Sequence, residues 1–136
     1  MPHNVFGKKL NRDTGQRQAL LKGLAGALIR SEAIETTEAK AKAAVPLIEK
    51  LITQARRARL SDIRQIESVI PDRELVQKLV HELAPRFKIR PGGFLRLIKL
   101  GNRMGDNAPM VRMEFTAPAT PVPVTPEPKP VKKTGK

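Results

Sequence analysis

The placement of proline limits which part of this chain can fold. Residues 117–136 hold six of the chain's 12 prolines and almost no large apolar side chains. Proline lacks a backbone donor and favours extended conformations, so we predict a disordered Pro/Lys-rich tail over residues 117–136. Residues 1–13 have too little apolar surface to fold alone, which predicts a basic arm that gains order only on a partner. A single globular domain is expected over residues 14–116.

The first half of this domain has the apolar periodicity of two helices. Asp13 and Thr14 can cap the first helix, in which apolar residues recur every three or four positions to about Arg30. Thr37 can cap the second. Proline inside a helix removes one hydrogen bond, so we expect Pro46 either to kink this second helix or to delay its start.

Two further helices are predicted before the chain becomes strongly basic. Ser61 can cap a short third helix, whose apolar face would include Ile66. A fourth helix opens at Pro71 and Asp72, and we expect Pro85 to stop it.

Three segments are typical of strands. Residues 33–37 are short and rich in β-branched side chains, which favours an edge strand. Residues 110–115 alternate between apolar and polar side chains, and residues 94–100 can pair with them as a hairpin joined by residues 101–109. The predicted fold class is therefore α/β of the α+β type, with four helices packed on a small mixed sheet of about three strands.

The charge of the chain is strongly one-sided. There are 26 Lys+Arg against 13 Asp+Glu, a formal net charge of +13, and the sequence pI is about 10.8, a value typical of nucleic-acid-binding domains. The stretch from Pro85 to Met104 holds six cations around Gly92-Gly93 and no acidic residue. An uncompensated positive surface is most simply explained by a polyanion, with nucleic acid as the leading candidate.

Residues that could carry chemistry are few. The chain has no cysteine, and its histidines, His3 and His81, show no metal-ligand spacing. No nucleophile and base arrangement stands out, and Gly92-Gly93 lacks the lysine and hydroxyl residue of a P-loop. No stretch reaches the length of a membrane helix. We expect no catalytic residue, no metal, no cofactor, no small-molecule substrate and no membrane partner, and we interpret the chain as a soluble cytoplasmic protein.

The scarcity of aromatic residues restricts how nucleic acid could be bound. Four phenylalanines are the only aromatic residues, and periodicity assigns Phe94 and Phe115 to the core. With few stacking platforms, binding should depend on phosphate contacts and shape, which favours structured RNA over unpaired strands. Glycine at 92 and 93 would allow a turn and also a close approach of the backbone to a phosphate.

Six motifs occur in order along the chain: Gly7-Lys8-Lys9-Leu10-Asn11-Arg12, Gln16-Arg17-Gln18-Ala19-Leu20, Ile34-Glu35-Thr36-Thr37 with Lys40-Ala41-Lys42, Ala84-Pro85-Arg86-Phe87, Gly92-Gly93-Phe94 and Gly105-Asp106-Asn107-Ala108-Pro109. With these motifs, nearly the whole stretch from Gly7 to Phe115 resembles the L-seventeen family of bacterial large-subunit ribosomal proteins.

The resemblance implies a non-enzymatic α/β domain in the large ribosomal subunit of the cytoplasm. Its partners would be 23S rRNA near the polypeptide exit tunnel and neighbouring ribosomal proteins. The backbone at Gly92 and Gly93 would approach the RNA. The candidate RNA-binding side chains are Lys8, Lys9, Arg12, Arg17, Lys22, Arg30, Arg86, Lys88, Arg90, Arg96, Lys99 and Arg103.

Two other classes of protein share part of this pattern. A nucleoid-type DNA-binding protein would have the same charge and Pro/Lys tail, but it should also offer a recognition helix or a dimerisation surface, and neither is evident. An RNA-modifying enzyme would need a cofactor motif or a convergent acid and base set, which the sequence lacks.

Overall fold

The computed structural model describes residues 8–117, and the order of elements in this range confirms the predicted α+β class. Residues 1–7 of the predicted arm and residues 118–136 of the predicted tail lie outside the described residues. The elements are α1 (Thr14–Ser31), β1 (Ala33–Thr37), α2 (Glu38–Arg57), α3 (Leu60–Val69), α4 (Arg73–Lys78), η1 (Leu79–Leu83), α5 (Ala84–Arg86), β2 (Leu95–Asn102) and β3 (Pro109–Phe115).

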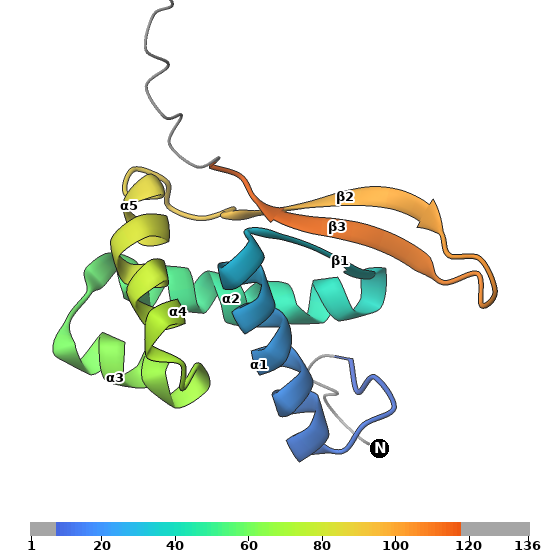
Figure 1. The fold of residues 1–136 in the computed structure, drawn as a ribbon, viewed down its shortest axis with the longest axis horizontal. Helices are drawn as coiled ribbons and strands as arrows, with labels where there is room; N and C mark the ends of the chain where they lie inside the picture. Colours follow the sequence, from blue (N-terminus) through green and yellow to red (C-terminus); the bar gives the residue numbers. More distant parts are fainter. Residues whose placement is uncertain (1–7, 118–136) are drawn as a thin grey trace, which may run out of the picture.

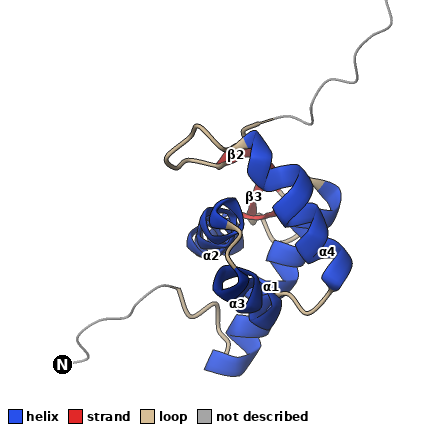
Figure 2. Ribbon diagram, turned by 90° about the vertical axis from the view of Figure 1, so that its left-hand side faces the viewer, coloured by secondary structure: helices blue, strands red, loops and turns tan. Residues whose placement is uncertain are grey.

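The helices lie on one side of a three-stranded sheet, and α2 contacts all three strands (Figure 1). Viewed after a quarter turn, α2 lies below β2 and β3, and α4 lies across the core from it (Figure 2). The β2–β3 hairpin extends well past the end of α2 in Figure 1. One end of the sheet therefore covers the helical core, and the other projects from it.

The sheet has the order β1-β3-β2 and both of its strand pairs are antiparallel, so the prediction of a mixed sheet was wrong. The reason is topological: β2 and β3 form the predicted hairpin, and β1 pairs with the outer side of β3. As predicted, β1 is an edge strand. Val111, Met113 and Phe115 of β3 are buried and Arg112 is exposed, as the alternation indicated.

The predicted helix caps differ in whether a side chain makes the capping bond. Asp13 Oδ1 accepts a hydrogen bond from Gln16 N–H at 2.8 Å, which starts α1 where the sequence predicted. Thr37 occupies the capping position of α2 but makes no side-chain bond. Ser61 lies inside α3, because that helix begins one residue earlier, at Leu60. The position predicted for Thr37 is confirmed, although its side chain makes no capping bond, and the capping role predicted for Ser61 was wrong.

Both helix prolines lie inside helical segments, and for Pro46 this leaves the kink as the remaining predicted alternative. The second helix begins at Glu38 and continues through Pro46, so its start is not delayed. Pro85 does not stop the fourth helix, because α4, η1 and α5 follow one another without a break to Arg86. Pro85 has no amide to donate to a carbonyl four residues back, and the chain adjusts with the wider π-helical turn η1, in which Ala84 N–H bonds the Leu79 carbonyl.

Three phenylalanines join the helical layer to the sheet. Phe87, at the end of α5, lies with its ring centroid 5.2 Å from that of Phe94 and 6.0 Å from that of Phe115. Phe87 has no exposed surface, Phe94 is 1% exposed and Phe115 is 6% exposed. The core assignment of Phe94 and Phe115 is confirmed, and Phe87 is the aromatic residue that connects them.

An ion pair fixes the helix that precedes these rings. Glu32 ends α1 in a left-handed conformation, with φ 64°, and its carboxylate receives two bonds from the Arg86 guanidinium, at 2.8 and 3.3 Å. Lys78 Nζ lies 3.5 Å from the same carboxylate. The bonds from Arg86 hold the pKa of Glu32 below its ordinary value, and Arg86 itself is only 11% exposed.

Replacement of Phe87 tests the aromatic cluster. We expect Phe87→Ala to lower the free energy of unfolding by about 3–5 kcal/mol, because it removes a fully buried ring between two others. Leu60→Ala is the control, since this leucine is 65% exposed and should cost little. Urea denaturation measures both, and equal losses in the two variants would contradict the assignment.

Glu32→Gln tests the ion pair through its pH dependence. We expect a loss of about 1.5–3 kcal/mol in the free energy of unfolding near neutral pH, because Arg86 and Lys78 lose a charged acceptor. Because folding lowers the pKa of Glu32, its stabilisation is present above the ordinary value of 4.5 and is lost as the pH falls through the lower folded value. The difference between wild type and variant should therefore shrink in acid. A pH-independent difference, or the same loss in the exposed control Glu67→Gln, would contradict this.

Candidate nucleic-acid interface

The part of the arm that the structure describes forms a tight turn rather than an extended segment. Arg12 N–H donates to the Lys9 carbonyl at 3.1 Å, and the Arg12 guanidinium donates to the Leu10 carbonyl at 3.0 Å. Leu10 and Asn11 both have left-handed φ values, 56° and 53°, which cost free energy in residues other than glycine. Residues 9–12 of the predicted arm therefore form a turn, whereas an extended conformation was expected.

Cations gather on this turn and on the first half of α1. Lys8, Lys9 and Lys22 are exposed, and Arg17 is half-buried. Within residues 8–22 the only acidic residue is Asp13, whose carboxylate accepts the capping bond of α1. We call Lys8, Lys9, Arg12, Arg17 and Lys22 the arm–α1 surface. No ion pair involves any of them within residues 8–117.

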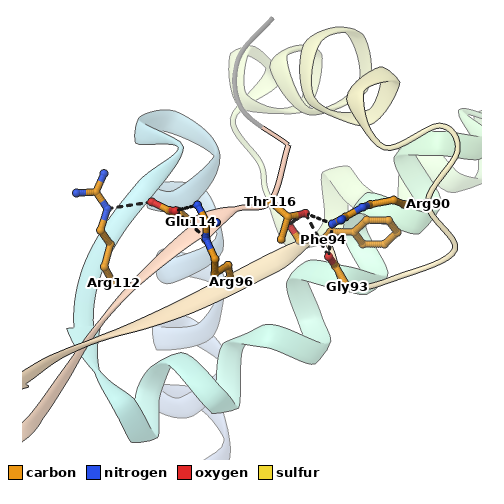
Figure 3. A network of polar contacts seen from close by, with 7 residues as sticks. All are labelled: Arg90, Gly93, Phe94, Arg96, Arg112, Glu114 and Thr116. Carbon is orange, nitrogen blue, oxygen red and sulfur yellow. Dashed lines mark hydrogen bonds and ion pairs between the residues drawn. The ribbon is translucent and has the colours of Figure 1, made fainter.

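The basic stretch between Pro85 and Met104 is partly neutralised by carboxylates from elsewhere in the fold. Arg86 belongs to α5 and pairs with Glu32. Arg96 pairs with Glu114 of the neighbouring strand, which also lies 3.1 Å from Arg112 Nε (Figure 3). The sequence, in which this stretch contains no acidic residue, could not reveal these partners.

Two more of the candidate cations have carboxylate partners. The Arg103 guanidinium lies 2.5 Å from the Asp106 carboxylate in the hairpin turn and lowers the pKa of Asp106 to about 2. Arg30, at the end of α1, lies 3.5 Å from Asp72. Together with Arg86 and Arg96, these make four of the twelve candidate cations that are engaged in ion pairs.

The turn at Gly92-Gly93 is held by polar contacts from Arg90. Its guanidinium donates to the Gly93 carbonyl at 3.2 Å and to Thr116 Oγ1 at 2.6 Å, as Figure 3 shows. Thr116 N–H in turn bonds the Phe94 carbonyl at 3.0 Å. Arg90 therefore positions the glycine turn against the end of β3, and Lys88 on the same loop is exposed.

The two glycines differ in what the fold requires of them. Gly93 has φ +65°, which favours glycine on conformational grounds. Gly92 is not in the left-handed region, and a Cβ added there would meet nothing within 4 Å. The fold thus explains Gly93, whereas Gly92 leaves an open backbone surface that a ligand could approach.

Two candidate residues were missed by the sequence reasoning. Arg56, at the end of α2, donates to the Lys88 carbonyl at 3.1 Å and lies 5.6 Å from the centre of the Phe94 ring. Lys42 lines a groove together with Lys8 and Arg17. Lys42 falls in the Lys40-Ala41-Lys42 motif, so the motif was the available signal. A helical residue shows which face it occupies only once its neighbours are known.

Neither a metal-binding cluster nor a membrane-spanning helix is found among the described residues. Between residues 8 and 117, no group of three or more His, Cys, Asp or Glu side chains could hold a metal ion. Over the same range, no helix is both long and apolar enough to cross a membrane. His81 lies exposed on the π turn η1.

Comparison with known proteins shows which family the chain resembles. The chain is 48% identical over 121 residues to the large ribosomal subunit protein bL17 of Thermodesulfovibrio yellowstonii, covering 89% of this chain and 91% of that protein. It is 44% identical over 115 residues to the protein of the same name from Syntrophotalea carbinolica (85% and 74% covered) and 48% identical over 115 residues to that from Gemmatimonas aurantiaca (85% and 98% covered).

A family model described as "Ribosomal protein L17" matches residues 20–116, which include every helix and strand from α2 to β3. Neither the nucleoid-type protein nor the RNA-modifying enzyme is supported by these matches. The motif resemblance is confirmed, as is the prediction that the chain is not an enzyme: the chain belongs to the ribosomal protein L17 family, whose members are structural proteins.

Proposed function

We propose that this protein is a structural constituent of the large ribosomal subunit in the cytoplasm, that it binds 23S rRNA near the polypeptide exit tunnel, and that its side chains act through phosphate and shape contacts. Neighbouring large-subunit proteins are its other proposed partners. Family membership supports the ribosomal setting. The contribution of the structure is to separate cations that already have a carboxylate partner from those that do not.

The observation that carries the proposal is the charge of the arm–α1 surface. None of its five cations forms an ion pair within residues 8–117, and the one acidic residue among residues 8–22, Asp13, is occupied at the helix cap. Cations without protein partners can replace the counterions of RNA phosphates, and the released counterions favour binding. The arm turn and α1 fix the backbone positions of these residues, so little backbone order remains to be gained on binding.

The glycine turn provides a second proposed contact. Lys88 and Arg90 flank it, and Lys99 lies on the adjoining strand β2 without an ion pair in the described part of the chain. The backbone at Gly92 is open on its outer side. We propose that a phosphate approaches this backbone while Lys88 contributes charge. Lys99 is further along β2, near Glu38 of α2, and would make a separate contact.

Eight of the twelve candidate cations are therefore the principal proposed contacts, and the four in ion pairs contribute less. The eight are Lys8, Lys9, Arg12, Arg17, Lys22, Lys88, Arg90 and Lys99. Arg30, Arg86, Arg96 and Arg103 already have carboxylate partners, and RNA would have to compete with those carboxylates.

Charge reversal tests the arm–α1 surface. We expect the triple change of Lys8, Lys9 and Lys22 to Glu to reduce co-sedimentation with large subunits in high salt at least tenfold, because three phosphate contacts become repulsive. The matched control reverses Lys132, Lys133 and Lys136, which changes the net charge equally but lies outside the arm–α1 surface. Equal losses in the two variants would show that net charge alone matters.

Substitution of the glycines tests the proposed backbone contact. We expect Gly92→Val to leave the thermal midpoint nearly unchanged, because the added side chain meets no neighbour, yet to weaken binding to 23S rRNA. Gly93→Val should lower the thermal midpoint, because its φ of +65° is unfavourable for a β-branched residue. Calorimetry and filter binding measure the two properties. Unchanged RNA affinity in Gly92→Val would remove the turn from the interface.

A further inference from the structure

A groove separates the arm turn from α1 and α2, and its lining combines charge with an apolar floor. Lys8 of the arm, Arg17 of α1 and Lys42 of α2 supply the charge, and Leu21, Pro46 and Leu47 supply the apolar surface. Its volume is about 360 Å³, within the range of roughly 300–1,000 Å³ found for small-molecule sites. A simple phosphate needs no floor of this kind.

The charge of the groove remains positive after its internal contact is counted. Lys42 Nζ lies 2.6 Å from Glu38 Oε1, and this bond is the main reason that the pKa of Glu38 is lowered, with smaller effects from Lys99 and Lys8. Arg17 and Lys8 have no ion pair within residues 8–117. A ligand in the groove would therefore meet cations with a single nearby carboxylate, which favours an anion.

The apolar floor is only partly covered by the fold. Leu21 and Leu47 are half-buried, and Pro46 is exposed although it lies in the middle of α2. Pro46 also has no amide to donate to the Lys42 carbonyl, so this oxygen lacks the partner that an α-helix normally provides. The groove thus contains an exposed proline ring next to its cations.

The arm turn that closes one side of the groove is conformationally strained. Two consecutive left-handed residues, Leu10 and Asn11, directly follow Lys8 and Lys9. Such backbone conformations persist when the surroundings determine them, and they are frequent at ligand sites. Here the turn directs the chain so that Lys8 lines the groove beside Arg17.

We propose that this groove binds one unpaired nucleotide of the bound RNA, with its phosphate near Lys8 and Arg17 and its base against Leu21, Pro46 and Leu47. The proposal rests on the rRNA-binding function proposed above and adds a subsite to it. The cations of the groove favour an anion such as a phosphate, and its apolar residues favour a planar ring attached to that anion. A nucleotide whose base is displaced from a structured RNA carries both a phosphate and a planar ring.

Titration of the full chain with small probes tests the subsite without the ribosome. Amide chemical shifts would be followed with adenosine 5′-monophosphate, ribose 5-phosphate and inorganic phosphate at equal concentration and ionic strength. We expect the nucleotide to shift the amides of Leu21, Ala43 and Leu47 and to bind at least threefold more tightly than ribose 5-phosphate, because only the nucleotide carries a base. Equal affinities for the three probes, or shifts confined to other surfaces, would overturn the proposal.

Three variants separate the groove from general charge. Arg17→Gln should weaken nucleotide binding several-fold, and Lys50→Gln, an exposed lysine of the same helix α2 outside the groove, should not. Pro46→Ala should weaken nucleotide binding while raising the thermal midpoint, because alanine is the better helix residue. A loss of binding in Pro46→Ala therefore cannot come from unfolding, and unchanged binding in this variant would contradict the base-binding role of the floor.

The result of the probe titration can be distinguished from the result of the charge-reversal test of the proposed function. If the probes fail to shift the groove while the protein still enters large subunits, the subsite is wrong and the rRNA-binding proposal stands. If the groove binds the nucleotide but reversal of the arm–α1 surface does not affect incorporation, the RNA-binding role proposed for that surface is wrong instead.

Discussion

The contact between Glu32 and Arg86 determines how the two halves of the domain meet. Glu32 lies at the sharp, left-handed end of α1, just before β1, and Arg86 ends the helix that leads to β2. Residues 54 positions apart are thus held by two hydrogen bonds. Arg86 extends toward Glu32, and the next residue, Phe87, turns into the core against Phe94 and Phe115. One helix end therefore supplies both the ion pair and the aromatic cluster that join helices to sheet.

This arrangement changes how the charge of the chain should be interpreted. Counted along the sequence, the stretch from Pro85 to Met104 contains only cations. In the fold, Glu32, Asp106 and Glu114 reach three of them, so part of the basic stretch is committed to structure. The arm–α1 surface has the opposite character, since its single carboxylate serves as a helix cap. The positive surface available to RNA is consequently displaced toward the arm, α1 and the glycine turn.

The sequence was most informative where a single physical rule decides the structure. Alternation in β3 predicted its buried face, and the Asp13 carboxylate marked the start of α1. Prediction from the sequence failed where contacts between residues distant in sequence determine the structure. Pro85 was expected to end a helix, but burial of Leu83 and Phe87 on either side favours continuing it through a π turn. The antiparallel partner of β1 also depends on tertiary packing. The sequence predicted which cations are candidates for RNA binding, but it could not predict which carboxylates pair with them.

The central claim is that cations without carboxylate partners bind RNA and that paired ones contribute little. The most direct test is the dependence of rRNA affinity on salt for two single neutralisations, Lys22→Gln and Arg103→Gln. Lys22 has no ion pair among residues 8–117, whereas Arg103 is paired with Asp106. Each lost phosphate contact reduces the slope of log affinity against log salt by about 0.7–0.9. The account predicts this reduction for Lys22→Gln and an unchanged slope for Arg103→Gln. Equal reductions in both variants, or none in Lys22→Gln, would contradict it.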